Sequence, residues 1–404
     1  MDKEQNFEGV RGFSLGSFAV SWEQRKLGEM GQTYTGLSGK TKDDFGHGQA
    51  RFVTYMNVFS NPISNPEMTE PIEIDPKQNE VEVGDVFFTT SSETPEEVGM
   101  SSILLEKRGK TYLNSFCFGF RPSEKIDSYY LAYMLRSEST RAKIILLAQG
   151  ISRYNISKNK VMEIAVSLPS LDEQKMIGQY FSQLDNLITL HQRKYDKLTN
   201  VKKSMLEKMF PKNGSNVPEI RFKGFSDAWE QRKAVDIADY SKGNGYSKSD
   251  LTENGTPIIL YGRLYTKYQF AIDEVDTFAT PKDGSIYSQG NEVIIPASGE
   301  TAEDIARASA VEKSGILLGG DLNILRPFNF INPLFLALTI SNGEPQKELA
   351  KKAQGKSVVH IHNSDIQEVT VSFPTRAEQD RIVAVFRSLD NLITLHQCEY
   401  IFEK

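Results

Sequence analysis

The sequence has few of the residues that build disulfide frameworks, metal sites or membrane spans. Only Cys117 and Cys398 are cysteines among 404 residues, too few for a disulfide scaffold or a structural zinc site. No apolar run reaches the ~18 residues that cross a bilayer, and Met1–Val20 lacks a signal-peptide pattern. We therefore expect a cytoplasmic protein that has no membrane segment and holds no metal.

Recognisable catalytic motifs are also missing. The segment Ala350–Ser357 fits a relaxed phosphate-loop pattern, but it follows an expected helix and precedes a β-branched run. A true phosphate loop follows a strand and opens a helix. The segment Asn332–Phe335 is the nearest match to the motif of nucleotide-methylating enzymes and lacks its second proline. No nucleophile–base pair stands out, so we expect a non-catalytic chain that binds no cofactor itself.

The net charge of −6 does not by itself indicate a nucleic-acid partner, but the basic residues are unevenly distributed. Six basic residues and one acid lie between Arg136 and Lys160, and a lysine cluster occupies the matching place in the second half, from Lys347 to Lys356. Charge alone leaves two interpretations open, a patch that meets phosphates or a solvated helix face.

A nine-residue phrase that occurs twice organises the chain. Leu184–Gln192 returns letter for letter as Leu389–Gln397, 205 positions later. A shorter phrase, Trp22–Lys26, returns as Trp229–Lys233, 207 positions later. Such identity at half the chain length indicates an internal repeat, so the protein is one unit used twice.

Each long phrase lies in a segment with the pattern of a long helix. Pro169–Glu173 and Pro374–Glu378 place a hydroxyl residue three positions before Glu, as in a capping box. Heptad-spaced apolar residues follow, and Gln179–Phe210 contains neither Pro nor Gly, which predicts a first helix of about 39 residues and ~58 Å. An apolar stripe on a helix must be buried against another surface, and the equivalent helix of the other half can bury it. We therefore expect two antiparallel coiled-coil helices related by a pseudo-two-fold axis. The stripe residues assigned to the helix seam and to subunit docking are Ile177, Leu184, Leu187, Leu198, Ile382, Leu389 and Leu392.

His191 and His396 fall inside these stripes. They are either a metal-binding or pH-sensing pair, or seam residues that share a polar contact. We favour the second interpretation because no other ligand types converge there.

The rest of each half has the pattern of an α+β fold, mostly strand with one late helix. Short β-rich runs such as Arg51–Val58 and Val81–Phe88 lie between turn-rich segments, and a helical pattern runs from Tyr129 to Leu147. The expected parts are a mobile lead-in over 1–20, a globular domain over 21–168, a long helix over 169–212, a linker over 213–227, a second globular domain over 228–373 and a shortened second helix over 374–404.

A set of motifs recurs in the same order in both halves. The first half carries Trp22–Lys26, Gly84–Phe88, Glu93–Thr94, Gln149–Ser152 and Leu168–Ile177. In the second half, Gln354–Ser357 and Phe373–Ile382 correspond to the last two of these motifs. With this combination the chain resembles the specificity subunits of type I restriction–modification enzymes, over essentially its whole length.

The resemblance implies a DNA reader without catalysis. Each globular domain would be a target recognition domain for one half of a bipartite double-stranded DNA site. The helices would set the spacing, ~10 bp centre to centre between unlike half-sites, and would dock two methyltransferase subunits. Those subunits would carry S-adenosylmethionine, and motor–nuclease subunits using ATP and magnesium would join for cleavage. Two departures stand out: the second helix lacks a Met-Phe-Pro end before Lys404, and Phe13–Val20 replaces what Ile220–Phe225 supplies later.

The residues expected to contact DNA fall into two groups. Basic residues beside the Gln-Gly loops are the expected phosphate contacts, namely Arg153, Lys158, Lys351, Lys352 and Lys356. An early loop that differs between the halves carries the expected base readers Tyr261, Arg263 and Lys267. The competing hypothesis is a coiled-coil interaction scaffold with two ligand-binding domains; a fused methyltransferase–nuclease is opposed by the missing motifs.

Overall fold

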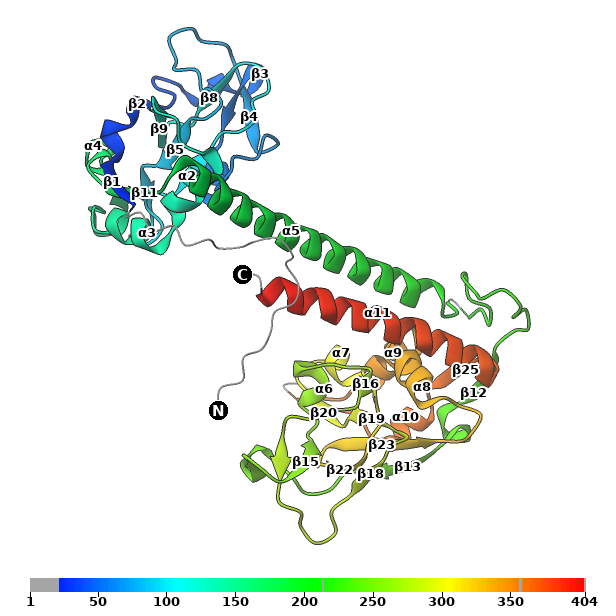
Figure 1. Ribbon diagram of the computed structural model, residues 1–404. Coiled ribbons are helices and arrows are strands. Elements are labelled where there is room, and N and C mark those ends of the chain that lie inside the picture. The colour runs from blue at the N-terminus through cyan, green and yellow to red at the C-terminus, as the bar shows by residue number, and fades with distance from the viewer. Residues whose placement is uncertain (1–21, 213, 356–357, 403–404) are drawn as a thin grey trace. The chain divides into compact units, whose positions relative to one another are not determined.

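Figure 1 shows the computed structural model, which describes residues 22–212, 214–355 and 358–402. The chain divides into two compact units, Met1–Leu187 and Ile188–Lys404, and the boundary falls inside the longest helix. The lead-in expected over 1–20 lies outside the described residues.

The first unit is built on an antiparallel sheet with the strand order β2-β9-β5-β7. Its central strand, β5, is buried at every residue because its two faces look into two different apolar clusters. Val86 and Phe88 face one cluster and Phe87 faces the other, as the two-residue period of a strand requires. The sheet consists of β2 (Gly31–Thr35), β9 (Cys117–Pro122), β5 (Val86–Thr89) and β7 (Ser101–Ile103).

Further strands and four short helices complete this unit. A second sheet has the order β4-β3-β8, and β1 pairs with β11. These strands are β4 (Thr69–Ile72), β3 (Phe45–Val53), β8 (Thr111–Leu113), β1 (Glu23–Lys26) and β11 (Ala165–Leu168). The helices are α1 (Tyr55–Ser60), α2 (Ser128–Arg136), α3 (Glu138–Ile145) and α4 (Lys158–Met162).

The second unit repeats this plan around a five-stranded sheet with the order β13-β23-β19-β21-β16. Here β19 is the fully buried strand, with Val293 and Ile295 on one core and Ile294 on the other. The sheet consists of β13 (Ala238–Lys242), β23 (Leu322–Pro327), β19 (Glu292–Pro296), β21 (Ser309–Val311) and β16 (Ala271–Ile272). A further sheet contains β14 (Leu251–Thr252), β17 (Phe278–Ala279), β15 (Thr256–Ile259), β22 (Ser314–Leu318) and β18 (Tyr287–Gln289). The helices are α6 (Arg263–Thr266), α7 (Ala302–Ile305), α8 (Pro333–Ile340), α9 (Gly343–Lys352) and α10 (Asn363–Gln367).

The internal repeat is visible in the strand pairing. In the first unit β1 pairs with β11 so that Glu23 lies opposite Leu168. In the second unit β12 (Glu230–Lys233) pairs with β25 (Thr370–Phe373) in the same way, with Glu230 opposite Phe373. The predicted α+β class, with two similar strand-rich domains and a long helix between them, is confirmed.

Each unit ties its long helix to its late helix through a buried glutamine. The long helices are α5 (Leu171–Lys208) and α11 (Arg376–Phe402). Gln379 accepts a hydrogen bond from the backbone N–H of Asn332, the N-cap residue of α8, at 2.7 Å. Gln174 accepts one from Asp127, the N-cap residue of α2, at 3.0 Å. The Glu-Gln pair shared by the two helix starts therefore positions each helix against its own domain.

The glutamates of the expected capping boxes also have tertiary partners. Glu173 accepts a hydrogen bond from the indole N–H of Trp22 at 3.2 Å. Glu378, which is buried, binds the Arg221 guanidinium through both oxygens at 2.7 and 2.8 Å. Arg221 lies in the segment expected as a linker, and Phe222 beside it packs on the core of the second unit. This part of the segment is thus held against the second unit.

The helix α5 has 38 residues, which correspond to ~57 Å. Its C-terminal part packs on α11 within the second unit, where His191 contacts His396 and Lys202 forms an ion pair with Asp390. Residue numbers increase along α5 while those of its partners decrease, so this part of the pair is antiparallel, as predicted. The two histidines are half-buried and their Nδ1 atoms are 3.0 Å apart.

The predicted seam residues have different environments. Ile382 is buried in the core of the second unit and Leu389 packs against that core, while Ile177, Leu184 and Leu198 are half-buried. Leu187 is 42% exposed and Leu392 is 43% exposed. The stripe is therefore partly domain core and partly open surface.

Candidate nucleic-acid interface

The Gln-Gly motifs form the same tight loop in both units. In the first unit Gln149 and Asn155 exchange two backbone hydrogen bonds, both of 2.9 Å. In the second unit Gln354 and His360 do so at 3.1 and 2.8 Å. Each pair of hydrogen bonds closes a loop that contains the glycine of the motif.

The glycine of each loop has a backbone conformation that other residues rarely adopt. Gly150 has φ +150° and Gly355 has φ +144°. A Cβ atom added to Gly150 would lie 2.0 Å from the carbonyl oxygen of Arg153, and one on Gly355 would lie 1.8 Å from that of Val358. Steric clashes therefore exclude a larger residue at the second position of the Gln-Gly motif. The backbone of the loop can keep this conformation only with glycine there.

Short strand pairs hold both loops beside the Glu-Thr motif. In the first unit β10 (Tyr154–Asn155) pairs with β6 (Ser91–Ser92), directly before Glu93–Thr94. In the second unit β24 (Val359–His360) pairs with β20 (Ser298–Gly299). Two motifs far apart in the sequence thus become neighbours in each unit.

Arg153 and Lys158, predicted as phosphate contacts, lie on and just after the first loop. Arg153 is exposed; its guanidinium is 3.4 Å from the Ser91 hydroxyl oxygen and lies 5.9 Å from the centre of the Phe116 ring. Lys158 is half-buried at the first position of α4. The structure brings Arg153, but not Lys158, into one exposed group with an aromatic ring.

Two residues of this surface were not predicted from the sequence. Ile151, inside the loop, is 95% exposed, and Phe116 is 53% exposed. The Phe116 carbonyl accepts hydrogen bonds from Thr90, directly before β6, at 2.9 and 2.8 Å. An isoleucine within a polar, glycine-containing turn was the available signal for Ile151, whereas only the fold places Phe116 beside Arg153. We call Phe116, Ile151 and Arg153 the loop cluster.

Two arginines of the basic stretch in the first half do not face solvent as a phosphate patch would require. Arg136 donates to the carbonyl oxygens of Ser101, Val58 and Phe59 at 2.7–3.0 Å, and burial lowers the pKa of Arg136 to about 10. Arg141 donates to three carbonyl oxygens between residues 96 and 99. The donors of these two side chains are taken up by backbone carbonyls at the end of α1, in β7 and in the turn before β7, which does not favour a phosphate contact for either of them.

The lysines predicted as phosphate contacts of the second unit are not equivalent. Lys351 is exposed on α9. Lys352 forms an ion pair with Glu368, and the hydrogen bond from Lys352 to this carboxylate raises the pKa of Lys352. Lys356 lies outside the described residues. The ion pair offsets the charge of Lys352 before any phosphate approaches.

The predicted base readers lie around the short helix α6, and two of them share an internal partner. Arg263 and Lys267 both pair with Asp276, and these contacts, that of Lys267 first, lower the pKa of Asp276 to about 2. The Arg263 side chain is only 10% exposed and also contacts Gln269 at 3.1 Å. Tyr261 is half-buried, and its ring is tilted against that of Tyr265, with the two ring centres 6.2 Å apart. Base reading by these residues stays a prediction, and for Arg263 it would require the release of Asp276.

The described residues contain no cluster of three or more His, Cys, Asp or Glu side chains that could hold a metal ion. Over the same residues, no helix combines the length and the apolar character needed to cross a membrane.

Comparisons with known proteins point in one direction. The family model of the type I restriction modification DNA specificity domain matches residues 19–200 and 226–401. The type I restriction enzyme MjaVIII specificity subunit of Methanocaldococcus jannaschii is 25% identical over 315 residues, which cover 74% of this chain and 71% of that protein. A putative MjaX specificity subunit of the same organism is 26% identical over 214 residues, 52% of this chain and 49% of that protein.

A solved structure has the same fold. The S subunit of a type I restriction–modification system from M. genitalium superposes with a TM-score of 0.54 at 14% identity. The match covers 97% of this chain and 95% of that one. At this identity the likeness describes the fold alone.

Proposed function

The chain belongs to the family of type I restriction–modification DNA specificity domains, and from this premise we propose that it reads a bipartite DNA site for such a complex. Each recognition domain, over 21–168 and 228–373, contacts one half of the site. The observation that carries the proposal is that the same pair of backbone hydrogen bonds closes the Gln-Gly loop in both units, while the surrounding side chains differ. A common backbone frame with different side chains suits two readers of different half-sites.

The loop cluster of the first unit has the chemistry of a DNA contact. Arg153 offers a guanidinium that can bind a phosphate or a base edge, and the Phe116 ring beside it limits the conformations of that side chain. Ile151 projects an apolar group of the kind that some DNA-binding proteins insert between base steps. An isoleucine exposed to this extent in water would bury apolar surface on binding.

In the second unit the contribution of charge is smaller. Lys351 keeps an exposed ammonium, whereas the charges of Lys352, Lys267 and Arg263 are offset by Glu368 and Asp276. We therefore expect Lys351 to make a phosphate contact, as we also expect of Lys158 in the first unit. The half-site of the second unit is then read mainly by uncharged groups such as Tyr261.

The exposed apolar residues of the long helices support a docking role. Leu187 and Leu190 on α5 and Leu392 and Leu395 on α11 are all exposed, although they lie in the repeated phrase. Apolar positions that the chain itself leaves open fit the surface of another subunit. We propose that two methyltransferase subunits cover them. Those partners carry S-adenosylmethionine, and motor–nuclease subunits supply ATP- and magnesium-dependent cleavage, while this chain neither methylates nor cuts DNA.

The test is the salt dependence of DNA binding by the complex of this chain with its methyltransferase subunits. Each phosphate contact contributes about 0.9 to the slope of log K against log salt, so Arg153→Ala should lower that slope by ~1 if Arg153 contacts a phosphate. Arg108→Ala is the matched control, because Arg108 is also exposed but paired with Glu67 and Glu106.

Unchanged slopes for both variants would count against a DNA contact at the loop cluster. Binding without any sequence preference would favour the interaction scaffold over the DNA reader. Methyl transfer by the purified chain alone would contradict the non-catalytic role.

A further inference from the structure

The two Gln-Gly loops carry the same two kinds of side chain in opposite order. The first loop runs from residue 149 to 155 and the second from 354 to 360, and each is closed by its pair of backbone hydrogen bonds. In the first loop Ile151 precedes Arg153, whereas in the second Lys356 precedes Val358. Each loop therefore has one β-branched aliphatic residue and one cation, two positions apart, and neither loop contains an acidic residue.

The backbone confirms that these positions match. Arg153 and Val358 hold the same place, because each offers the carbonyl oxygen that a Cβ atom on the loop glycine would meet first. Ile151 and Lys356 each follow that glycine directly. Both aliphatic side chains are open to solvent, with Ile151 95% exposed and Val358 47% exposed. The exchange of order thus moves the apolar group from one side of the loop turn to the other.

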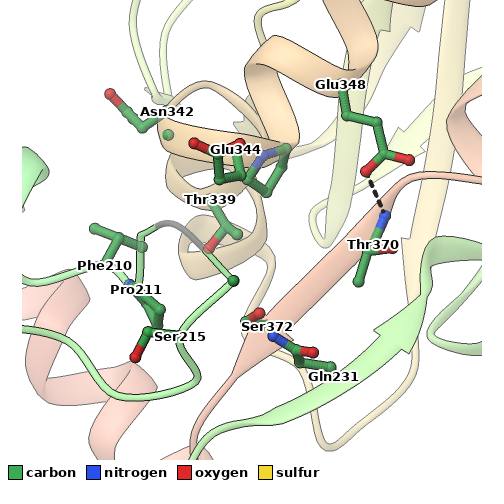
Figure 2. Close-up of a pocket in the computed structure, with 13 residues that line it drawn as sticks. Phe210, Pro211, Ser215, Gln231, Thr339, Asn342, Glu344, Glu348, Thr370 and Ser372 are labelled. Carbon is green, nitrogen blue, oxygen red and sulfur yellow. Dashed lines mark hydrogen bonds between the residues drawn. The ribbon is translucent and has the colours of Figure 1, made fainter.

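The helix before the second loop, α9, is acidic in its first turns and basic at its end. Figure 2 shows Glu344 and Glu348 beside a cavity of about 270 Å³, where Glu348 accepts a hydrogen bond from the Thr370 N–H at 3.1 Å. Lys347 pairs with Glu344, so its charge is already offset. Lys351, in the last turn, is exposed. Because carboxylates repel phosphates, DNA should approach α9 at its last turn, next to the loop.

Carboxylates also lie beside the loops, at the strands that pair with them. Glu93 directly follows β6 and Glu300 directly follows β20, and both are exposed. Glu97 accepts a hydrogen bond from the Ser92 hydroxyl at 3.0 Å. Such groups repel phosphates, whereas the N4 amino group of a cytosine can donate a hydrogen bond to one of them. This side of each loop therefore suits base edges better than the phosphate backbone.

An exposed aliphatic group at a base edge has one apolar partner in the major groove, which is the 5-methyl group of thymine. The alternative, a wedge between base steps, uses longer side chains such as Phe, Leu, Ile or Met. Ile151 could serve in that way, but Val358 is too short. Both residues are β-branched, so few rotamers are open to them and the aliphatic tip is held in place. Contact with a methyl group is the one base contact that both loops can make.

We propose that Ile151 and Val358 are specificity-determining residues, each of which reads a thymine through van der Waals contact with its 5-methyl group. Ile151 reads a thymine in one half-site and Val358 reads one in the other. The cation two positions away in each loop, Arg153 or Lys356, contacts a phosphate. This inference rests on the proposed function, because it requires that the loops contact DNA.

Deoxyuridine is the probe, because it differs from thymidine only in lacking the 5-methyl group. The complex of the full chain with its methyltransferase subunits is titrated with duplexes that carry its target site, identified by sequencing methylated DNA. The thymines of the site are replaced one at a time. We expect one replacement in each half-site to weaken binding about fourfold, as the loss of one buried methyl group should.

Two variants assign the contacts, and each is the control for the other. Ile151→Ala should remove the difference between thymine and uracil in one half-site only, and Val358→Ala should remove it in the other only. Both side chains are exposed in the free chain, so neither change should unfold it.

Sequence-specific binding that no uracil replacement weakens would overturn this inference and leave the proposed function standing. A uracil effect that persists in both variants would also overturn it. So would an equal loss of affinity for thymine and uracil duplexes in Ile151→Ala, which would indicate insertion between base steps instead. Binding without any sequence preference would overturn the proposed function and this inference together.

Discussion

Replacing Gln379 by alanine should loosen the attachment of α11 to the second unit. The side chain is fully buried; its oxygen accepts from the Asn332 N–H at 2.7 Å, and its nitrogen donates to the carbonyls of Pro374 and Phe330 at 2.9 and 3.1 Å. Alanine leaves a buried N–H and two carbonyls without these partners. A buried group left unpaired costs ~1–3 kcal/mol, and the Phe330 carbonyl lies where water has easier access, so we expect a loss of about 3 kcal/mol.

Urea unfolding can measure this loss in the second unit alone. The chain has two tryptophans, one in each unit, and Trp229 is 2% exposed within the core of the second. In a Trp22→Phe background, Trp229 fluorescence reports only that unit. With a slope of ~2 kcal/mol per molar urea, a loss of 3 kcal/mol lowers the midpoint by about 1.5 M.

The matched control is Gln397→Ala, which removes an exposed glutamine from the same helix. Its midpoint should stay within a few tenths molar of the parent, because exposed changes away from special contacts have small effects. Equal midpoints for Gln379→Ala and Gln397→Ala would refute the conclusion that the buried glutamine fixes α11 to α8.

Three further outcomes are expected. Gly150→Ala should weaken DNA binding while the far-ultraviolet circular dichroism stays unchanged, because the added Cβ distorts only the exposed loop; unchanged affinity would contradict this. Leu392→Asp should leave the chain folded but abolish its co-elution with methyltransferase subunits on size exclusion, and an intact complex would refute docking at this face. Four residues inserted between Tyr195 and Asp196 lengthen α5 by ~6 Å, and should widen the unread gap of the target by about one or two base pairs. Altered half-sites, found by sequencing methylated DNA, would show that the helix is not the spacer.

The position of a side chain relative to other elements accounts for the sequence-based assignments that failed or were incomplete. Arg136 and Arg141 are basic in the sequence, yet backbone carbonyls of α1, of β7 and of the turn before β7 take up their donors. Arg263 similarly meets Asp276 across a turn. Local sequence shows that a charge is present, but whether it remains available depends on partners distant in the chain.

The sequence by itself determined the repeat, the α+β class, the family and the existence of two long helices. These follow from patterns that are local or copied: a nine-residue identity, helical spacing without proline or glycine, and motifs that recur in the same order in both halves. Only the tertiary structure decided which stripe residues are core and which are open, and that Phe116 lies beside Arg153. The burial and the contacts of a side chain depend on which distant segments pack against it, and a local sequence pattern does not contain that information.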